Sequence, residues 1–256
     1  MRFGCSVTLE LLDAAAAVGC SFVELSTAVL LPERADGDTV DVLNRLCRAS
    51  APAEVWDLSL PEGSAVCGPS VEWPKITRHV YTVLRRASAV GGSVVGISCG
   101  NAFSVPRGFS HREALGQISD FFMMCGAVAR KHGMVVGIEP RCFDRSVPIR
   151  SLPQAMEIAR GVNSPGVGVL PNLSHIKTAG QSILDIADAA AWLAHVHVSE
   201  SDLADRSDGS DLTPELWHAL RLADYQGRVG IRGKWTGGAE DMAQALQALQ
   251  SYLSPL

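Results

Sequence analysis

Eight short apolar runs alternate with helical patterns along the 256 residues of this chain. The runs are rich in valine and isoleucine, and the segments between them carry apolar residues spaced as on one face of a helix. The predicted strands cover residues 2–7, 21–26, 53–60, 93–99, 134–139, 166–172, 194–199 and 228–234. The predicted helices cover residues 9–18, 39–49, 71–90, 111–132, 152–162, 183–192, 214–223 and 238–253. Such alternation is typical of α/β proteins with a parallel sheet.

Eight strand and helix units in a chain of this length are what a closed (β/α)8 TIM barrel requires. No linker or low-complexity tract divides the sequence, so we expect residues 1–256 to form a single domain. A doubly wound open sheet is the alternative, because periodicity does not show whether the first and last strands meet.

The composition argues against several classes of protein. A net charge of −5 gives no electrostatic footprint for nucleic acid. No apolar stretch reaches the roughly 18 residues of a membrane span, and the N-terminus does not resemble a signal peptide. The seven cysteines lack CxxC spacing, which argues against a disulfide framework or a zinc knot. We expect a cytoplasmic protein with reduced thiols that binds neither nucleic acid nor membrane; the sequence leaves homo-oligomer formation open.

Polar residues follow the last four predicted strands. Because the carboxyl ends of barrel strands converge on one mouth, their side chains are candidates for a single site. Alternation along a strand separates its two faces, and the apolar face must meet the helices. By this rule the interior of the barrel receives Glu24, Glu139, His195, His197, Arg232 and Lys234.

Several motifs, in this order and spacing, give the chain a family resemblance. They are Trp56 to Pro61 with Gly68-Pro69, Gly100-Asn-Ala-Phe-Ser-Val-Pro-Arg-Gly-Phe109, Ile138-Glu-Pro140, Asn172-Leu-Ser-His175, His195-Val-His-Val198 and Tyr225-Gln-Gly-Arg-Val-Gly-Ile231. The chain resembles the xylose-isomerase-like TIM barrels, especially the hydroxypyruvate isomerase and ketose 3-epimerase branch of sugar isomerases and epimerases. The resemblance covers nearly the whole chain.

The resemblance implies a divalent metal held by Glu, Asp, His and Glu on strands five to eight, with two of the carboxylates serving as an acid/base pair. Glu139 and His197 occupy the first and third of these positions. However, Asn172 stands in place of the Asp and Arg232 in place of the second Glu. A further family Glu falls on Arg145.

These replacements change the charge of the predicted site. Three carboxylates and a neutral histidine offer about −3 to a divalent ion, whereas the four residues of this chain sum to about zero. A guanidinium is not deprotonated in proteins and repels a cation. We therefore expect no metal and no other cofactor here, and expect Arg232 to hold a carboxylate, a phosphate or an enolate oxygen instead.

The sequence predicts an isomerase or epimerase, or a related lyase, that acts without metal on a small and anionic oxygenated carbonyl compound. Glu139 is the expected general base, His197 or His175 its acid partner, and Arg232 stabilises the enolate charge. The predicted substrate-binding residues are Asn172, Arg145, Lys234, Glu24 and His195.

The alternative hypothesis is an inactive TIM barrel that binds a small ligand or a partner protein. In that case Glu139 and Arg232 form a buried ion pair that closes the mouth, and His195 is a core histidine with satisfied hydrogen bonds. Other chemistries have less support, because the chain lacks a GxGxxG motif, a complete P-loop and a Gly-x-Ser-x-Gly elbow. DNA repair endonucleases share this barrel, but they need a metal cluster and a basic groove.

Overall fold

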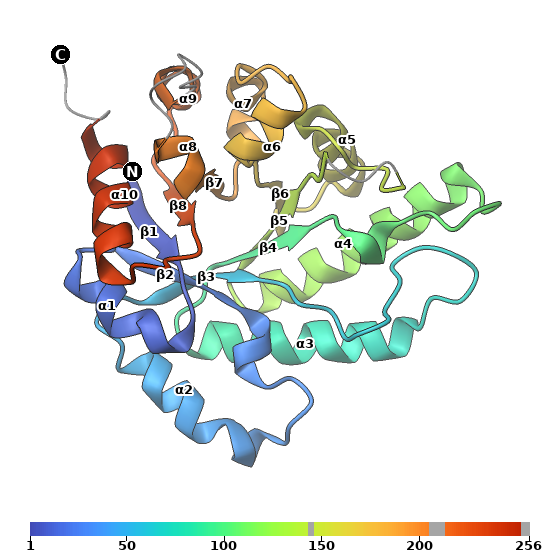
Figure 1. Ribbon diagram of the computed structural model, residues 1–256. Helices are drawn as coiled ribbons and strands as arrows, with labels where there is room; N and C mark the ends of the chain where they lie inside the picture. The colour runs from blue at the N-terminus through green and yellow to red at the C-terminus, as the bar shows by residue number, and fades with distance from the viewer. Residues whose placement is uncertain (143–145, 205–212, 252–256) are drawn as a thin grey trace.

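Eight parallel strands form one curled sheet at the centre of the protein (Figure 1). The computed structural model describes residues 1–142, 146–204 and 213–251. The strands are β1 (Arg2–Ser6), β2 (Phe22–Ser26), β3 (Ala53–Asp57), β4 (Val94–Ser98), β5 (Val135–Glu139), β6 (Val167–Val169), β7 (Val196–Ser199) and β8 (Arg228–Arg232). Their order in the sheet is β6-β5-β4-β3-β2-β1-β8-β7. All eight predicted strands are confirmed, each shorter than predicted at one end or both.

The two ends of the sheet meet between β6 and β7. Isolated parallel bridges join Val169 to Leu193 and Asn172 to His197. The backbone N–H of Ala194 donates to the carbonyl of Val169 at 3.0 Å, and that of His197 donates to Pro171 at 2.9 Å. These contacts support the predicted α/β TIM-barrel fold over the open sheet.

Helices cover the outside of the sheet, as Figure 1 shows for α1, α2, α3, α4 and α10. The α-helices are α1 (Leu12–Ala17), α2 (Val40–Cys47), α3 (Trp73–Ala89), α4 (His111–Lys131), α5 (Leu152–Val162), α6 (Leu173–Thr178), α7 (Asp185–Asp188), α8 (Glu200–Ala204), α9 (Thr213–Leu222) and α10 (Ala239–Ser251). Short 3-10 turns are η1 (Leu9–Leu11), η2 (Thr27–Leu30), η3 (Asp36–Thr39), η4 (Asn101–Phe103) and η5 (Ala190–Trp192). Within the described ranges, no helix has the length and apolarity that crossing a membrane requires.

Two of the described helices were not predicted, and two predicted helices are divided; the one predicted over 9–18 forms η1 and α1. α6 and α8 follow β6 and β7 directly and are too short to show a helical period. The segment predicted as one helix over 183–192 forms α7 and η5. The other helices begin near their sequence signals. At the start of α5, for example, Ser151 and Gln154 form a capping box, with side-chain to backbone distances of 3.3 and 3.1 Å.

The interior of the barrel has an apolar floor and polar layers above it. Phe22, Val55 and Val94 are buried together near the amino ends of their strands. Two residues further along β2 and β3, the same face presents Glu24 and Asp57. The alternation that points valines and isoleucines toward the helices therefore places carboxylates inside the upper barrel.

Gly230 on β8 leaves the space into which the carboxylate of Glu24 fits. A Cβ atom at this position would lie 1.6 Å from Glu24 Oε1 and 2.8 Å from His195 Nε2. We expect Gly230→Ala to destabilise the protein by more than the roughly 1–3 kcal/mol typical of an overpacked core, because all three groups are fixed by strands. Denaturant unfolding measures this cost.

The matched control is Gly116→Ala on the exposed face of α4, where a Cβ would meet nothing within 4 Å. That change should stabilise the protein by about 0.5–1 kcal/mol, the difference in helix propensity. Equal effects of the two substitutions would contradict the tight packing at Gly230.

Candidate active site

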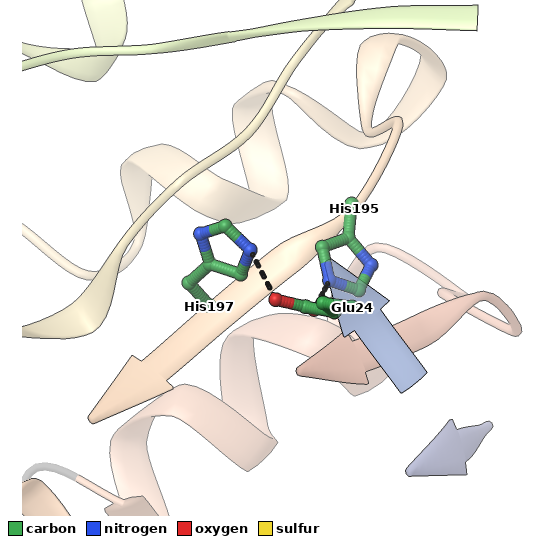
Figure 2. Close-up of side chains that lie close together, drawn as sticks. All are labelled: Glu24, His195 and His197. Atoms are coloured by element: carbon green, nitrogen blue, oxygen red, sulfur yellow. Dashed lines mark hydrogen bonds and ion pairs between the residues drawn. The ribbon is translucent and has the colours of Figure 1, made fainter. Parts of the chain in front are cut away.

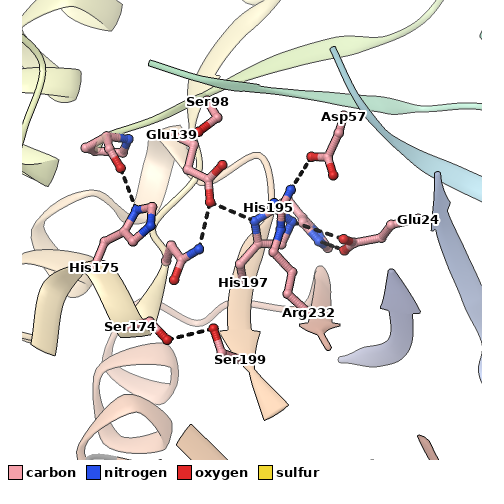
Figure 3. A network of polar contacts seen from close by, with 12 residues as sticks. Glu24, Asp57, Ser98, Glu139, Ser174, His175, His195, His197, Ser199 and Arg232 are labelled. Carbon is pink, nitrogen blue, oxygen red and sulfur yellow. Dashed lines mark hydrogen bonds and ion pairs between the residues drawn. The ribbon is translucent and has the colours of Figure 1, made fainter. Parts of the chain in front are cut away.

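Glu139 is the last residue of β5 and the centre of a polar network at the mouth of the barrel (Figure 3). Its side chain is only 1% exposed. One carboxylate oxygen, Oε1, accepts a hydrogen bond from Asn172 Nδ2 at 2.8 Å and another from His197 Nδ1 at 3.1 Å. Strands β5, β6 and β7 therefore bring together three of the predicted site residues.

His197 lies between two carboxylates. While its Nδ1 contacts Glu139, its Nε2 lies 3.2 Å from Glu24 Oε2. Burial and the charge of Arg232 lower the pKa of His197, but the two carboxylates outweigh them and raise it to about 9. With both ring nitrogens protonated, His197 is a buried imidazolium at neutral pH.

Glu24 and His195 lie deeper in the barrel, below Glu139. His195 Nε2 is 2.5 Å from Glu24 Oε1, and neither side chain has any exposed surface. Burial is the largest influence on the pKa of both groups. It lowers the pKa of His195. Burial raises the pKa of Glu24, but the two histidines outweigh this effect and hold that pKa well below the usual range. Both were predicted to bind substrate, and the structure places them beneath the mouth, in contact with one another (Figure 2).

Arg232, the last residue of β8, forms an ion pair with Asp57 at the end of β3. The Glu139 to Arg232 ion pair of the alternative hypothesis is therefore wrong, because Arg232 pairs with Asp57 instead. The negative charge of Glu139 nevertheless raises the pKa of Arg232. Arg232 Nε is buried and has no hydrogen-bond partner in the described part of the chain. Sequence analysis missed Asp57, whose position follows from the alternation that buries Trp56 against the helices.

His175 is on α6, three residues after Asn172. Its Nδ1 lies 2.8 Å from the carbonyl oxygen of Pro140 and donates to it. Burial lowers the pKa of His175 despite the nearby charge of Glu139, so the ring is neutral at neutral pH. With the proton on Nδ1, the lone pair of the neutral ring is on Nε2.

The remaining predicted residues lie at the edge of the site or outside the described part. Lys234 follows β8 and is exposed, and its backbone N–H donates to Glu200 Oε2 at 3.2 Å. Arg145 lies outside the described residues. Arg141, which was not among the predicted site residues, is exposed beside Glu139 and donates to Ser98 Oγ at 3.4 Å.

The four positions that the resemblance assigns to a divalent metal do not fit such an ion. Asn172 directs an amide N–H, not an oxygen, at Glu139. Arg232 adds a guanidinium, and His197 uses its Nδ1 proton to contact the same carboxylate. A hard cation prefers several oxygen ligands and negative charge, which this arrangement does not offer.

The fold and sequence identify the family. The sequence matches the family model of the xylose isomerase-like TIM barrel over residues 12–252, and the chain belongs to that family. A search of curated proteins found no match.

Three solved structures illustrate the likeness in fold. The apo structure of 3-keto-D-glucoside 4-epimerase, YcjR, from E. coli is similar with a TM-score of 0.80 and 18% identity, covering 98% of this chain and 99% of that chain. D-psicose 3-epimerase, crystallised in the presence of D-fructose, has a TM-score of 0.78 and 13% identity over 99% and 97%. The IOLI protein with a bound zinc atom has a TM-score of 0.75 and 16% identity over the whole of both chains.

Proposed function

We propose that this protein is an isomerase or epimerase that moves a proton next to the carbonyl group of a small, anionic oxygenated compound. In this proposal no divalent ion takes part at the mouth of the barrel. The observation that carries the proposal is the arrangement of Glu139, which is held by two donors through one oxygen and lies close to the fixed cation of Arg232. Its similarity in fold to sugar epimerases agrees with this chemistry.

Glu139 is the general base of the proposed reaction. Burial raises its pKa, but the charges of His197 and Arg232 outweigh burial and hold it well below the usual range. Glu139 is therefore ionised at neutral pH. Such a low pKa also makes it a weak base, so the enolate that forms must be strongly stabilised.

Arg232 provides that stabilisation. Its guanidinium is oriented by Asp57, and none of the residues that the structure describes accepts a hydrogen bond from its buried Nε–H. A donor of this kind, held in place before the reaction, stabilises negative charge as it develops on a substrate oxygen. The enolate then takes the proton back from Glu139 at the neighbouring carbon, or at the other face of the same carbon.

His175 and Asn172 serve the substrate hydroxyl groups in this proposal. The neutral ring of His175 accepts a proton from a hydroxyl group and returns it. Asn172 Oδ1 is buried and has no hydrogen-bond partner within the described ranges, so it accepts from a second hydroxyl group. Arg141, exposed at the mouth, supplies a positive charge for the anionic group of the substrate.

Hydrogen exchange into a panel of candidate substrates tests the proposal. The protein is mixed in D₂O with hydroxy-keto acids, their phosphorylated counterparts and neutral ketoses, and deuterium next to the carbonyl is followed by NMR. We expect exchange in anionic members of the panel, at a rate that added Mn²⁺ or Mg²⁺ does not change. Exchange that requires the added ion, or that occurs only in neutral ketoses, would contradict the proposal.

A second candidate is an inactive barrel that binds a ligand. The near-complete burial of Glu139 favours it, because a base must reach the substrate. The same experiment distinguishes the two candidates, since an inactive barrel shifts the resonances of a bound compound without exchanging its protons.

A further inference from the structure

A cluster of one carboxylate and two imidazoles lies below the proposed active site. Glu24, His195 and His197 each offer one ligand atom, and these atoms all lie within 4.8 Å of one another. All three side chains are fully buried. Figure 2 shows both rings directed toward the Glu24 carboxylate, that of His197 from β7 and that of His195 from the residue just before this strand.

The contact between Glu24 and His197 lacks a hydrogen bond. Glu24 Oε2 and His197 Nε2 are 3.2 Å apart, yet both atoms are buried and neither has a hydrogen-bond partner among the described residues. A separation of about 3.3 Å is expected between two ligands of a tetrahedral zinc ion with bonds of about 2.0 Å. The second contact, between His195 Nε2 and Glu24 Oε1, is 2.5 Å and must widen by under 1 Å to accept an ion.

The orientation of His197 agrees with metal binding at Nε2. Its other nitrogen, Nδ1, donates to Glu139 at 3.1 Å. Histidine ligands of metals usually donate their second N–H to a carboxylate, which fixes the tautomer and directs the lone pair to the ion. Glu139 has the position of that carboxylate.

The net charge of the buried groups around Glu24 also favours a bound cation. The carboxylates of Glu24, Glu139 and Asp57 face the guanidinium of Arg232 and the imidazolium of His197, so one negative charge remains among these groups. Charges buried without compensation are costly. A divalent ion bound by His195, His197 and Glu24 would displace the Nε2 proton of His197 and bring this sum to zero.

We propose that Glu24, His195 and His197 form a binding site for a late first-row divalent metal ion. Two imidazoles and one carboxylate suit zinc, cobalt or nickel better than magnesium or calcium, which prefer oxygen. The site is distinct from the mouth, where Asn172 and Arg232 oppose a cation. It holds together β2 and β7, which are separated in the sheet by β1 and β8.

Zinc binding by the full chain tests the proposal. The folded protein is equilibrated with excess Zn²⁺, passed over a desalting column and analysed for metal content, and the affinity is measured by competition with a chromogenic chelator. We expect one zinc ion per chain. Cobalt substitution should give the absorption bands of a site with two nitrogen ligands and no thiolate. A folded protein that retains no zinc overturns the proposal.

Three variants locate the ion. His195→Gln and Glu24→Gln remove ligands and should abolish measurable binding, while Glu139→Gln removes only the acceptor of the His197 proton and should weaken binding by about 10- to 100-fold. His79→Gln is the matched control, since His79 is also buried but contacts the carbonyl of Ser59 at 2.7 Å. Its zinc affinity should equal that of the wild type.

The opposite order of effects would place the ion at the mouth. If Glu139→Gln abolishes binding and His195→Gln leaves it unchanged, the proposed site is wrong. Circular dichroism of each variant shows whether it is folded. If the ligand variants do not fold, the cobalt spectrum of the wild type tests the proposal instead. Below the mouth, a spectrum with two imidazole ligands requires His195 in addition to His197.

Discussion

Replacing Glu139 by glutamine should lower the rate of proton exchange by about 10²- to 10⁴-fold, the contribution of a positioned general base. Glutamine keeps the shape of the side chain but has no basic oxygen. Because the change keeps the buried volume, the protein should remain folded, with one hydrogen bond to His197 or Asn172 weakened. The rate is measured by deuterium incorporation into whichever anionic compound the wild type processes.

The control for this substitution is Glu157→Gln on the exposed surface of α5, which removes a carboxylate far from the mouth. Its exchange rate should match that of the wild type. If Glu139→Gln keeps more than about a tenth of the wild-type exchange rate, the loss of rate is smaller than expected and Glu139 is excluded as the base.

The second large effect is expected at Arg232. Arg232→Ala should reduce kcat/KM by roughly 2–4 kcal/mol, the scale of a lost oxyanion donor. Arg232→Lys should recover part of this loss, because an ammonium keeps the charge but lacks the planar fork that contacts Asp57 and a substrate oxygen together. The side chain is 31% exposed, so the cost in stability should stay below the roughly 3–5 kcal/mol of a broken, fully buried pair.

Arg228→Ala is the matched control for Arg232→Ala. Arg228 lies on the same face of the same strand, four residues earlier, and pairs with Glu54 at 2.5 Å. Its loss should affect the denaturant midpoint and leave kcat/KM unchanged. A large loss of stability in Arg232→Ala with unchanged catalysis and ligand affinity would assign Arg232 a purely structural role.

Local patterns in the sequence predicted the strands and most of the inward-facing residues, but they missed Asp57 and wrongly placed Lys234, which is exposed, inside the barrel. Val136 and Ile138 point toward the helices, so Glu139 must point inward, and the same alternation on β7 places His195 and His197 inside. Their contacts with Glu139 and Asn172 follow from the convergence of adjacent strand ends. Strand ends were predicted too long because Asn172 and Lys234 continue the pattern after the ladder has ended.

Partners across the barrel could not be predicted in the same way. Arg232 pairs with Asp57, and Glu24 contacts His195 and His197, in each case across two intervening strands. Contacts across the interior depend on the stagger of all the strands between the two residues. The local periodicity of a sequence does not reveal this stagger. The sequence therefore predicted most of the side chains that enter the barrel, but not how their charges are paired.

The junction of β6 and β7 has a consequence for how the protein moves. Two isolated bridges hold it, whereas β4 and β5 are paired over five residues. Elements joined by few backbone hydrogen bonds open at a lower free energy than the rest of a fold. Asn172 and His197 face each other across this seam, and both donate to Glu139. Local opening of the β6–β7 junction would thus weaken the two hydrogen bonds that position Glu139. A substrate bound to both Glu139 and Asn172 would hold this junction closed.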